Sequence, residues 1–221
     1  MKVKDALQTV LRVKRIVPEE GMFFLTSMPR FLLKIISYNA LVGRVDALRN
    51  TPYAEDSEAD EAKLERLWAM IKGEDDILEA RHTSRWGEIG FQGKNPATDF
   101  RGMGVLGLDN LLYLFEKDHA VGMKIFGQSQ HPEFGFSFAI MAINFTNEAF
   151  QLLRSGKLKG YLYDLDAMEY NLGDFQDFFL SIFGEFADYW VMRKPANIMA
   201  FNEIKGDFMA DVEKRLTTGK W

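Results

Sequence analysis

The chain of 221 residues contains no cysteine, three histidines and six prolines. The absence of cysteine excludes disulfide bonds, thiolate nucleophiles, iron–sulfur clusters and thiolate-bound zinc. His82, His119 and His131 show neither a spacing of four residues nor an H-E-x-x-H motif, so the sequence predicts no metal site. We therefore expect a protein that holds no metal or cofactor of its own.

Long hydrophobic runs are missing as well. The longest apolar stretch, residues 21–43, contains Pro29, Arg30 and Lys34, and charged side chains are unfavourable at the centre of a bilayer. Basic side chains also interrupt every apolar run near the start of the chain, namely Lys2, Lys4, Arg12, Lys14 and Arg15. The sequence therefore predicts neither a membrane span nor a secretory signal, and we expect a cytoplasmic protein.

Positive charge is scarce overall, because 27 Lys and Arg face 32 Asp and Glu, a net charge of −5. This balance argues against a nucleic-acid binder, which needs a concentrated basic surface. Residues 1–49, however, carry nine basic and four acidic residues, while the remainder carries 18 and 28. Two interpretations stay open: a basic face toward an anionic membrane or an acidic partner, or a helical surface that is basic without a function.

Apolar residues recur at spacings of three and four, which predicts an all-α fold. The length favours a single core, so we expect one domain over residues 1–221, with a basic helical segment over residues 1–27. The stripes are Phe31, Ile35, Tyr38, Val42 and Val45, after a helix start at Ser27 and Pro29; Leu64, Leu67, Trp68 and Ile71; Phe138, Ala142, Phe145, Ala149 and Leu152, closed by Ser155 and Gly156; Phe175, Phe178, Phe179, Ile182, Phe183, Phe186 and Trp190; and Phe201, Ile204, Phe208, Val212 and Leu216. We expect these faces to form the core.

Residues 81–103 show no period, which predicts a long irregular loop before a central helix. Such a loop either carries function or only packs its aromatic residues. Thr98 or Asp99 is expected to cap a helix that runs to about Glu116. Its expected buried side comprises Leu108, Leu111, Leu112 and Phe115. Arg101 then falls in the first turn, where the helix dipole disfavours a cation, so it is expected to point outward or to pair with Asp99 or Glu88.

Residues 102–107 match G-x-G-x-x-G, the dinucleotide-binding pattern. No strand precedes them and no acid follows at the required distance, so we reject a dinucleotide site. Each of the three glycines costs a helix on the order of 1 kcal/mol relative to alanine. Their presence predicts that another backbone, or a partner protein, approaches closely here.

Residues 86–114 closely resemble the signature of the ELMO domain. They read W-G-E-I-G-F-Q-G-K-N-P-A-T-D-F-R-G-M-G-V-L-G-L-D-N-L-L-Y-L, against W-x-x-x-G-F-Q-G-x-x-P-x-T-D-F-R-G-x-G-x-L-x-L-x-x-L-x-Y-F, with Leu114 as the one departure. The likeness extends through residues 40–43, 49–53, 131–132, 136–144 and 195–201. No PH domain, armadillo array or Pro-rich tail is recognisable, so the chain resembles the short ELMO domain-containing branch.

The resemblance implies a single all-α domain and a GTPase-activating protein for Arf and Arf-like small GTPases, which regulate membrane traffic. It implies that Arg101, the arginine of the T-D-F-R-G motif, is the essential arginine finger. GTP and Mg²⁺ then belong to the partner. The other motif residues are expected to contact the partner or to support Arg101, with Gln92 or Asp99 holding it extended; they are Trp86, Gly90, Phe91, Gln92, Gly93, Thr98, Asp99, Gly102 and Gly104. The alternative is a non-catalytic adaptor or effector that binds small GTPases, and either form is expected in the cytoplasm or peripherally on endomembranes.

Overall fold

The computed structural model describes residues 3–14 and 22–221, and within these ranges every regular element is a helix. The α-helices are α1 (Val3–Lys14), α2 (Met22–Asn50), α3 (Glu58–Lys72), α4 (Gly104–Lys117), α5 (His119–Ser129), α6 (Phe138–Ser155), α7 (Lys159–Asp164), α8 (Leu172–Arg193) and α9 (Phe201–Thr218). Three 3-10 helices lie between them: η1 (Ser84–Ile89), η2 (Pro96–Gly102) and η3 (Ile198–Ala200). The all-α prediction is confirmed for the described residues.

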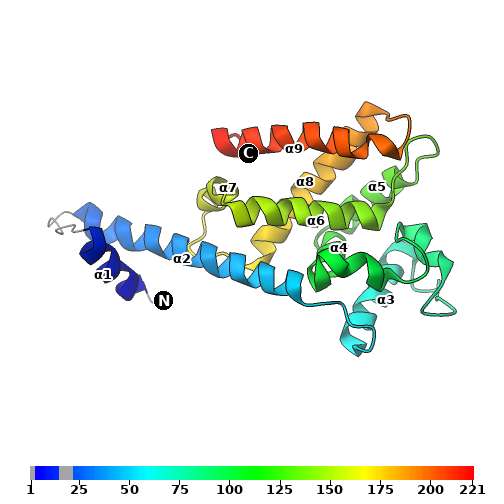
Figure 1. The fold of residues 1–221 in the computed structure, drawn as a ribbon, viewed down its shortest axis with the longest axis horizontal. Coiled ribbons are helices and arrows are strands. Elements are labelled where there is room, and N and C mark those ends of the chain that lie inside the picture. Colours follow the sequence, from blue (N-terminus) through cyan, green and yellow to red (C-terminus); the bar gives the residue numbers. More distant parts are fainter. Residues whose placement is uncertain (1–2, 15–21) are drawn as a thin grey trace.

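The longest helix, α2, runs along one side of the body, and α1 lies against its N-terminal end (Figure 1). Farther along, α2 packs against α4 and α6. Two buried hydroxyl groups in the middle of α2 hold it against the body, because Tyr38 donates to the carbonyl of Leu153 in α6 and Ser37 accepts the backbone N–H of Tyr170, just before α8. The C-terminal end of α2 lies beside the start of α4, where the N–H of Val105 donates to the carbonyl of Thr51.

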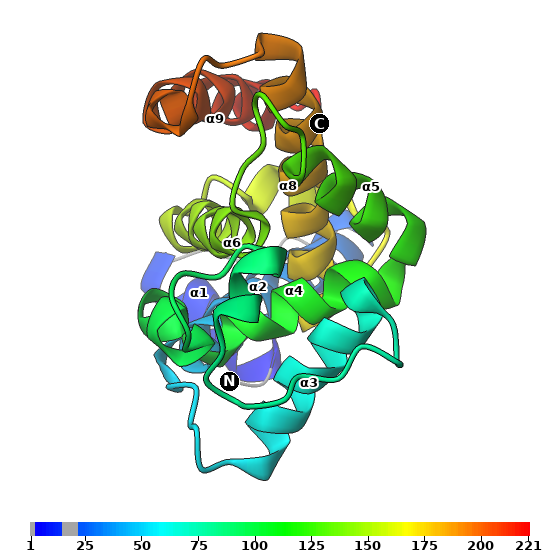
Figure 2. The ribbon, with the colours of Figure 1, turned by 90° about the vertical axis from the view of Figure 1, so that its right-hand side faces the viewer.

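Aromatic side chains join α6, α8 and α9 into the core. The ring centroid of Phe186 lies 4.5 Å from that of Phe145 and 5.3 Å from that of Phe208. Full burial of one such side chain stabilises the fold by about 1.5–3 kcal/mol. In the end view, α8 runs from α9 past α5 and α6 toward α4 (Figure 2), and it contacts each of these helices.

Four of the five predicted stripes are confirmed. Every member in α3, α6 and α8 is buried, and in α9 only Phe201 is half-buried. The predicted end of α6 is also confirmed, because Gly156 follows Ser155 with a left-handed φ of 84°. A residue with no Cβ adopts this conformation without strain, which explains why glycine stands there.

The first stripe needs two corrections. The helix does not start at Ser27 and Pro29, because α2 begins at Met22 and runs through Pro29 without the hydrogen bond that a proline N–H cannot make. Phe31 and Ile35 are not in the core either, since 59% and 44% of their surfaces are exposed. Their neighbour Leu32 is buried instead, so the apolar stripe faces partly away from the body.

The predicted basic segment over residues 1–27 contains α1 and the first turns of α2. Its residues 1–2 and 15–21 lie outside the described part of the chain. Across residues 3–14 and 22–221, no helix combines the length and the apolar character that crossing a bilayer requires.

Candidate functional site

Two short 3-10 helices fold the segment that the sequence left without a period. Thr83 accepts the N–H of Arg85 at the start of η1, and Asn95 accepts the N–H of Ala97 at the start of η2. Pro96 occupies the first position of η2, where a missing N–H is tolerated. The expectation of an irregular loop over residues 81–103 is therefore wrong for η1 and η2, which hold the motif in an ordered arrangement.

The expected helix start at Thr98 or Asp99 is also wrong, because these residues belong to η2 and α4 begins at Gly104. The first turn of α4 takes its cap from a distant backbone, since the N–H of Val105 donates to the carbonyl of Thr51 over 2.9 Å. The predicted buried side of this helix is confirmed, and the helix ends at Lys117, one residue from the expected Glu116.

Aromatic residues of the motif form the base of the site. Trp86, Phe91 and Phe100 are buried, and their rings stack edge to face in sequence, with centroids 5.9 Å and 5.5 Å apart. The indole N–H of Trp86 donates to the carbonyl of Arg81 over 2.8 Å. These side chains are packing residues in the described structure, which leaves partner contact to the exposed motif residues.

Asp99 connects the two halves of the motif. Its carboxylate accepts the backbone N–H of Gln92 over 2.8 Å. Burial raises the pKa of Asp99, and this effect outweighs the Gln92 N–H and the nearby charge of Arg101, which both lower it. Among the described residues, no hydrogen bond or ion pair joins Arg101 to the side chain of Gln92 or Asp99, so neither residue holds Arg101 in the way that the sequence suggested.

The glycines of the motif divide into two kinds. A Cβ on Gly90 would lie within 3 Å of backbone nitrogens at the start of α6, and one on Gly104 within 3 Å of three backbone carbonyl oxygens of residues 48, 49 and 51. The predicted close approach of another backbone is thus confirmed at Gly104, where it comes from this chain itself. Gly93 and Gly102 have open space around them, so a partner surface can approach there.

Arg101 is exposed at the end of η2. Its Nε donates to the carbonyl of Thr98 over 2.9 Å. The Nη1 and Nη2 atoms of the guanidinium take no part in this bond. The suggested ion pairs with Asp99 and Glu88 do not occur among the described residues, and Glu88 instead pairs with Lys72 and Arg85. The outward orientation of Arg101 is therefore the correct one of the two alternatives.

A cavity of about 360 Å³ lies beside Arg101. It is lined by Arg49, Asn50, Pro52, Tyr53, Ala97, Phe100, Arg101, Gly102 and Gly104. Sequence reasoning did not single out Arg49, although the likeness over residues 49–53 was a signal. Arg49 and Arg101 line one cavity although they lie 52 residues apart in the sequence, so their proximity has no local signature.

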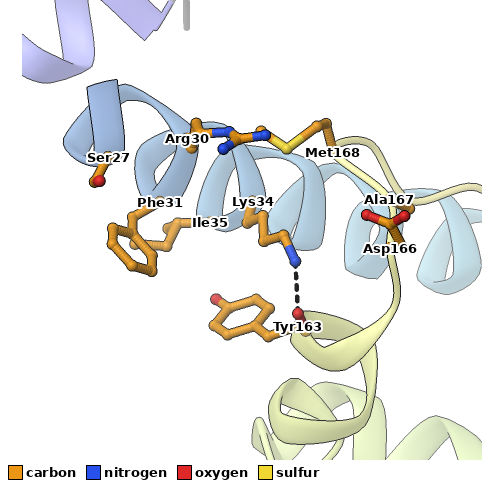
Figure 3. A pocket seen from close by; sticks show the side chains of 9 residues that line it. All are labelled: Ser27, Arg30, Phe31, Lys34, Ile35, Tyr163, Asp166, Ala167 and Met168. Carbon is orange, nitrogen blue, oxygen red and sulfur yellow. Dashed lines mark hydrogen bonds between the residues drawn. The ribbon is translucent and has the colours of Figure 1, made fainter. Parts of the chain in front are cut away.

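A second hollow, of about 350 Å³, lies at the opposite end of α2 between that helix and the segment after α7 (Figure 3). Exposed Phe31 and Ile35 flank it, with Arg30 and Lys34 beside them. Lys34 donates to the carbonyl of Tyr163, which closes one side. Within residues 3–14 and 22–221, no group of three or more His, Asp or Glu side chains is placed to hold a metal ion.

Comparison with known proteins gives consistent matches. The ELMO/CED-12 family model matches residues 43–205. The chain is 35% identical over 231 residues to "ELMO domain-containing protein 1" of Mus musculus, covering 97% of this chain and 71% of that protein. It is 37% identical over 206 residues to "ELMO domain-containing protein 2" of Homo sapiens, covering 93% and 70%, and 33% identical over 177 residues to "ELMO domain-containing protein B" of Dictyostelium discoideum, covering 80% and 61%. No solved structure matches significantly.

Proposed function

Because the chain belongs to the ELMO/CED-12 family, we propose that it is a GTPase-activating protein for Arf or Arf-like small GTPases. Arg101 enters the partner's nucleotide site as an arginine finger. The observation that carries this proposal is the exposure of Arg101 on an ordered platform, with its guanidinium outside every carboxylate ion pair among the described residues.

A small GTPase holds its own nucleotide, Mg²⁺ and water-orienting glutamine, and often lacks a cation against the charge that develops on the γ-phosphoryl group. An arginine supplied by another protein provides this charge and accelerates hydrolysis by about 10³- to 10⁵-fold. Guanidinium suits the role because it stays charged and its forked donors match phosphoryl oxygens. Thr98 fixes one edge of Arg101, which lowers the entropy lost when the other edge binds.

Single-turnover GTP hydrolysis by a panel of Arf and Arf-like GTPases tests the proposal. Wild-type protein should accelerate hydrolysis, and Arg101→Lys should lower the saturating rate by about 10³-fold or more. Lys94→Gln is the matched control, because Lys94 is an exposed cation of the same motif, outside the 3-10 helices. Equal rates with wild type and Arg101→Lys end the finger model. Thermal unfolding of Arg101→Ala should stay close to wild type, since an exposed side chain is lost.

The alternative, a non-catalytic adaptor or effector, differs in one measurable respect. It binds the same GTPases in a nucleotide-dependent manner and leaves the hydrolysis rate unchanged. Pull-down with GTPases loaded with a non-hydrolysable GTP analogue, carried out beside the kinetic panel, separates the two. Binding without acceleration favours the adaptor.

The hollow in Figure 3 favours a second activity, peripheral contact with an anionic membrane such as an endomembrane. Exposed Phe31 and Ile35 suit the acyl boundary, and each basic residue near such a surface contributes about 1 kcal/mol. Asp166 on the opposite wall opposes this attraction. Sedimentation with vesicles of neutral lipid, with and without phosphatidylserine, tests it: binding should require the anionic lipid and fall in Phe31→Ser. Equal sedimentation with both vesicle types excludes the activity.

A further inference from the structure

Two arginines from distant parts of the chain line the cavity beside the motif. Arg49 lies in the last turn of α2, and Arg101 lies near the end of η2. None of the described residues that line this cavity is an aspartate or a glutamate. In residues 3–14 and 22–221, neither guanidinium lies within ion-pair distance of a carboxylate, whereas Arg81, Arg85 and Arg215 each have one or more such partners. The cavity therefore carries two guanidinium groups that form no ion pair with a described residue, and Asp99 acts on Arg101 only over a longer distance.

The contacts of Arg49 leave part of its hydrogen-bonding capacity unused. Its Nη1 donates to the side chain of Asn50 over 3.2 Å, and its guanidinium carbon lies 5.0 Å from the ring centroid of Phe150. Its Nε is fully buried and has no acceptor among the described residues, and a group that enters the cavity from outside does not reach this atom. Its Nη2 forms no hydrogen bond or ion pair with a described residue, so this nitrogen is the donor that remains for a ligand.

We propose that this cavity receives the carboxylate of an aspartate or glutamate that protrudes from the partner, and that Arg49 is the residue that binds it. The proposal rests on the proposed function, because the partner is the GTPase on which Arg101 acts. A nucleotide held by the partner is recessed, so a group that enters a cavity of this chain must be a protruding side chain. The fork of donors on a guanidinium matches the two carboxylate oxygens.

The two arginines then have different roles, which follow from their exposure. Arg101 is exposed and reaches out toward the phosphoryl group, while Arg49 is half-buried and stays within the cavity. A charge-assisted hydrogen bond in such a partly desolvated place is stronger than one at an open surface. Arg49 therefore contributes to the affinity for the partner, and Arg101 to the rate of hydrolysis.

The first test uses Arg49→Met, which removes the charge and retains a long apolar stem against Phe150. The matched control is Arg154→Met, because Arg154 also lies over the ring of Phe150, at 6.0 Å, and does not line the cavity. Arg49→Met should raise the Kd for the GTPase loaded with a non-hydrolysable GTP analogue, and the KM for activation, by about tenfold or more. The saturating rate should be unchanged, and Arg154→Met should match wild type.

The second test needs no partner. Glutamate with both backbone ends blocked is titrated into the protein at constant ionic strength, while the Nε–H resonance of Arg49 is followed by NMR. A saturable shift that is absent in Arg49→Met supports the proposal. A shift that never saturates, or one caused by inorganic phosphate and not by the blocked glutamate, overturns it.

The outcomes separate this inference from the proposed function. If activation depends on Arg101 while Arg49→Met and Arg154→Met show the same KM, the carboxylate site is wrong and the finger stands. If hydrolysis is not accelerated but Arg49→Met weakens binding of the GTPase and the blocked glutamate saturates, the finger is wrong and the carboxylate site stands.

Discussion

Replacing Gly104 by alanine is expected to destabilise the protein and to distort the candidate site together. Gly104 has a φ of +53°, a left-handed conformation that costs an L-residue with a side chain about 1–2 kcal/mol. An added Cβ would also lie within 3 Å of the carbonyl oxygens of Leu48, Arg49 and Thr51. Real Cβ atoms essentially never approach so closely, so the end of α2 or the start of α4 must shift.

The two effects set the magnitude. Overpacking of a tight contact costs typically about 1–3 kcal/mol, which with the backbone strain gives about 2–5 kcal/mol in total. For a domain of this size, each kcal/mol lowers Tm by roughly 2–4 °C, so we expect a decrease of about 10 °C. The shift should also weaken the bond between the N–H of Val105 and the carbonyl of Thr51.

Urea unfolding and thermal unfolding of Gly104→Ala measure the effect, with Gly102→Ala as the control. Gly102 lies two residues earlier, and nothing lies within 4 Å of the place that its Cβ would occupy. Its substitution should change the free energy of unfolding by no more than about 0.5 kcal/mol. Equal stability of Gly104→Ala and Gly102→Ala would refute the close approach of α2 to the start of α4. A loss of GTPase activation in Gly102→Ala, at unchanged stability, would indicate that a partner surface approaches this open glycine.

Four further substitutions test the structure elsewhere. Asp99→Asn should become more stable relative to wild type as pH rises from about 3.8 through the raised folded pKa of Asp99, and this stability difference should be constant at higher pH. The cause is burial, which makes the folded protein bind the Asp99 proton more tightly than the unfolded chain does. Urea unfolding from pH about 3 to 7 measures the difference in the free energy of unfolding, and a difference independent of pH contradicts the prediction. Asn110→Ala should lower the free energy of unfolding by about 1–3 kcal/mol, because buried Asn110 bonds the side chains of Thr146 and Gln176, and unchanged urea unfolding would contradict this. Phe31→Ala should change the free energy of unfolding by no more than about 0.5 kcal/mol, while Leu32→Ala should lower it by about 2–5 kcal/mol. If thermal unfolding shows the reverse order, the face that contains Phe31 is the buried one, as the sequence predicted.

The core could be predicted from the sequence because it depends on local spacing. Phe175 to Trp190 in α8 repeat at three and four residues, and a helix with this pattern has one face that must be covered. The same spacing led to a wrong prediction of burial for Phe31 and Ile35, because a periodic stripe identifies one face of a helix and does not show whether another element covers it. At this end α2 extends beside α1, away from the larger helices (Figure 1).

The candidate site was predictable only in its residues. The signature identified Arg101 and the glycines, but 3-10 helices as short as η1 and η2 show no hydrophobic periodicity in the sequence. The start of α4 was missed for a related reason, since its cap is the carbonyl of Thr51, a residue far away in the chain. Arg49 reaches the cavity only through this tertiary contact, so no spacing within the motif indicates it.

The continuity of α2 bears on how the two ends of the protein communicate. Arg30 and Arg49 are 19 residues apart on this one helix, which corresponds to about 28 Å along its axis. This distance exceeds three Debye lengths of about 8 Å at physiological salt, so charge bound at one end is screened from the other. The two ends are joined through the helix itself, and the carbonyl oxygens of Leu48 and Arg49 at its C-terminal end lie against Gly104. A ligand at the N-terminal hollow therefore leaves the electrostatic potential of the arginine cavity unchanged, and the two sites can be tested independently of each other's charge.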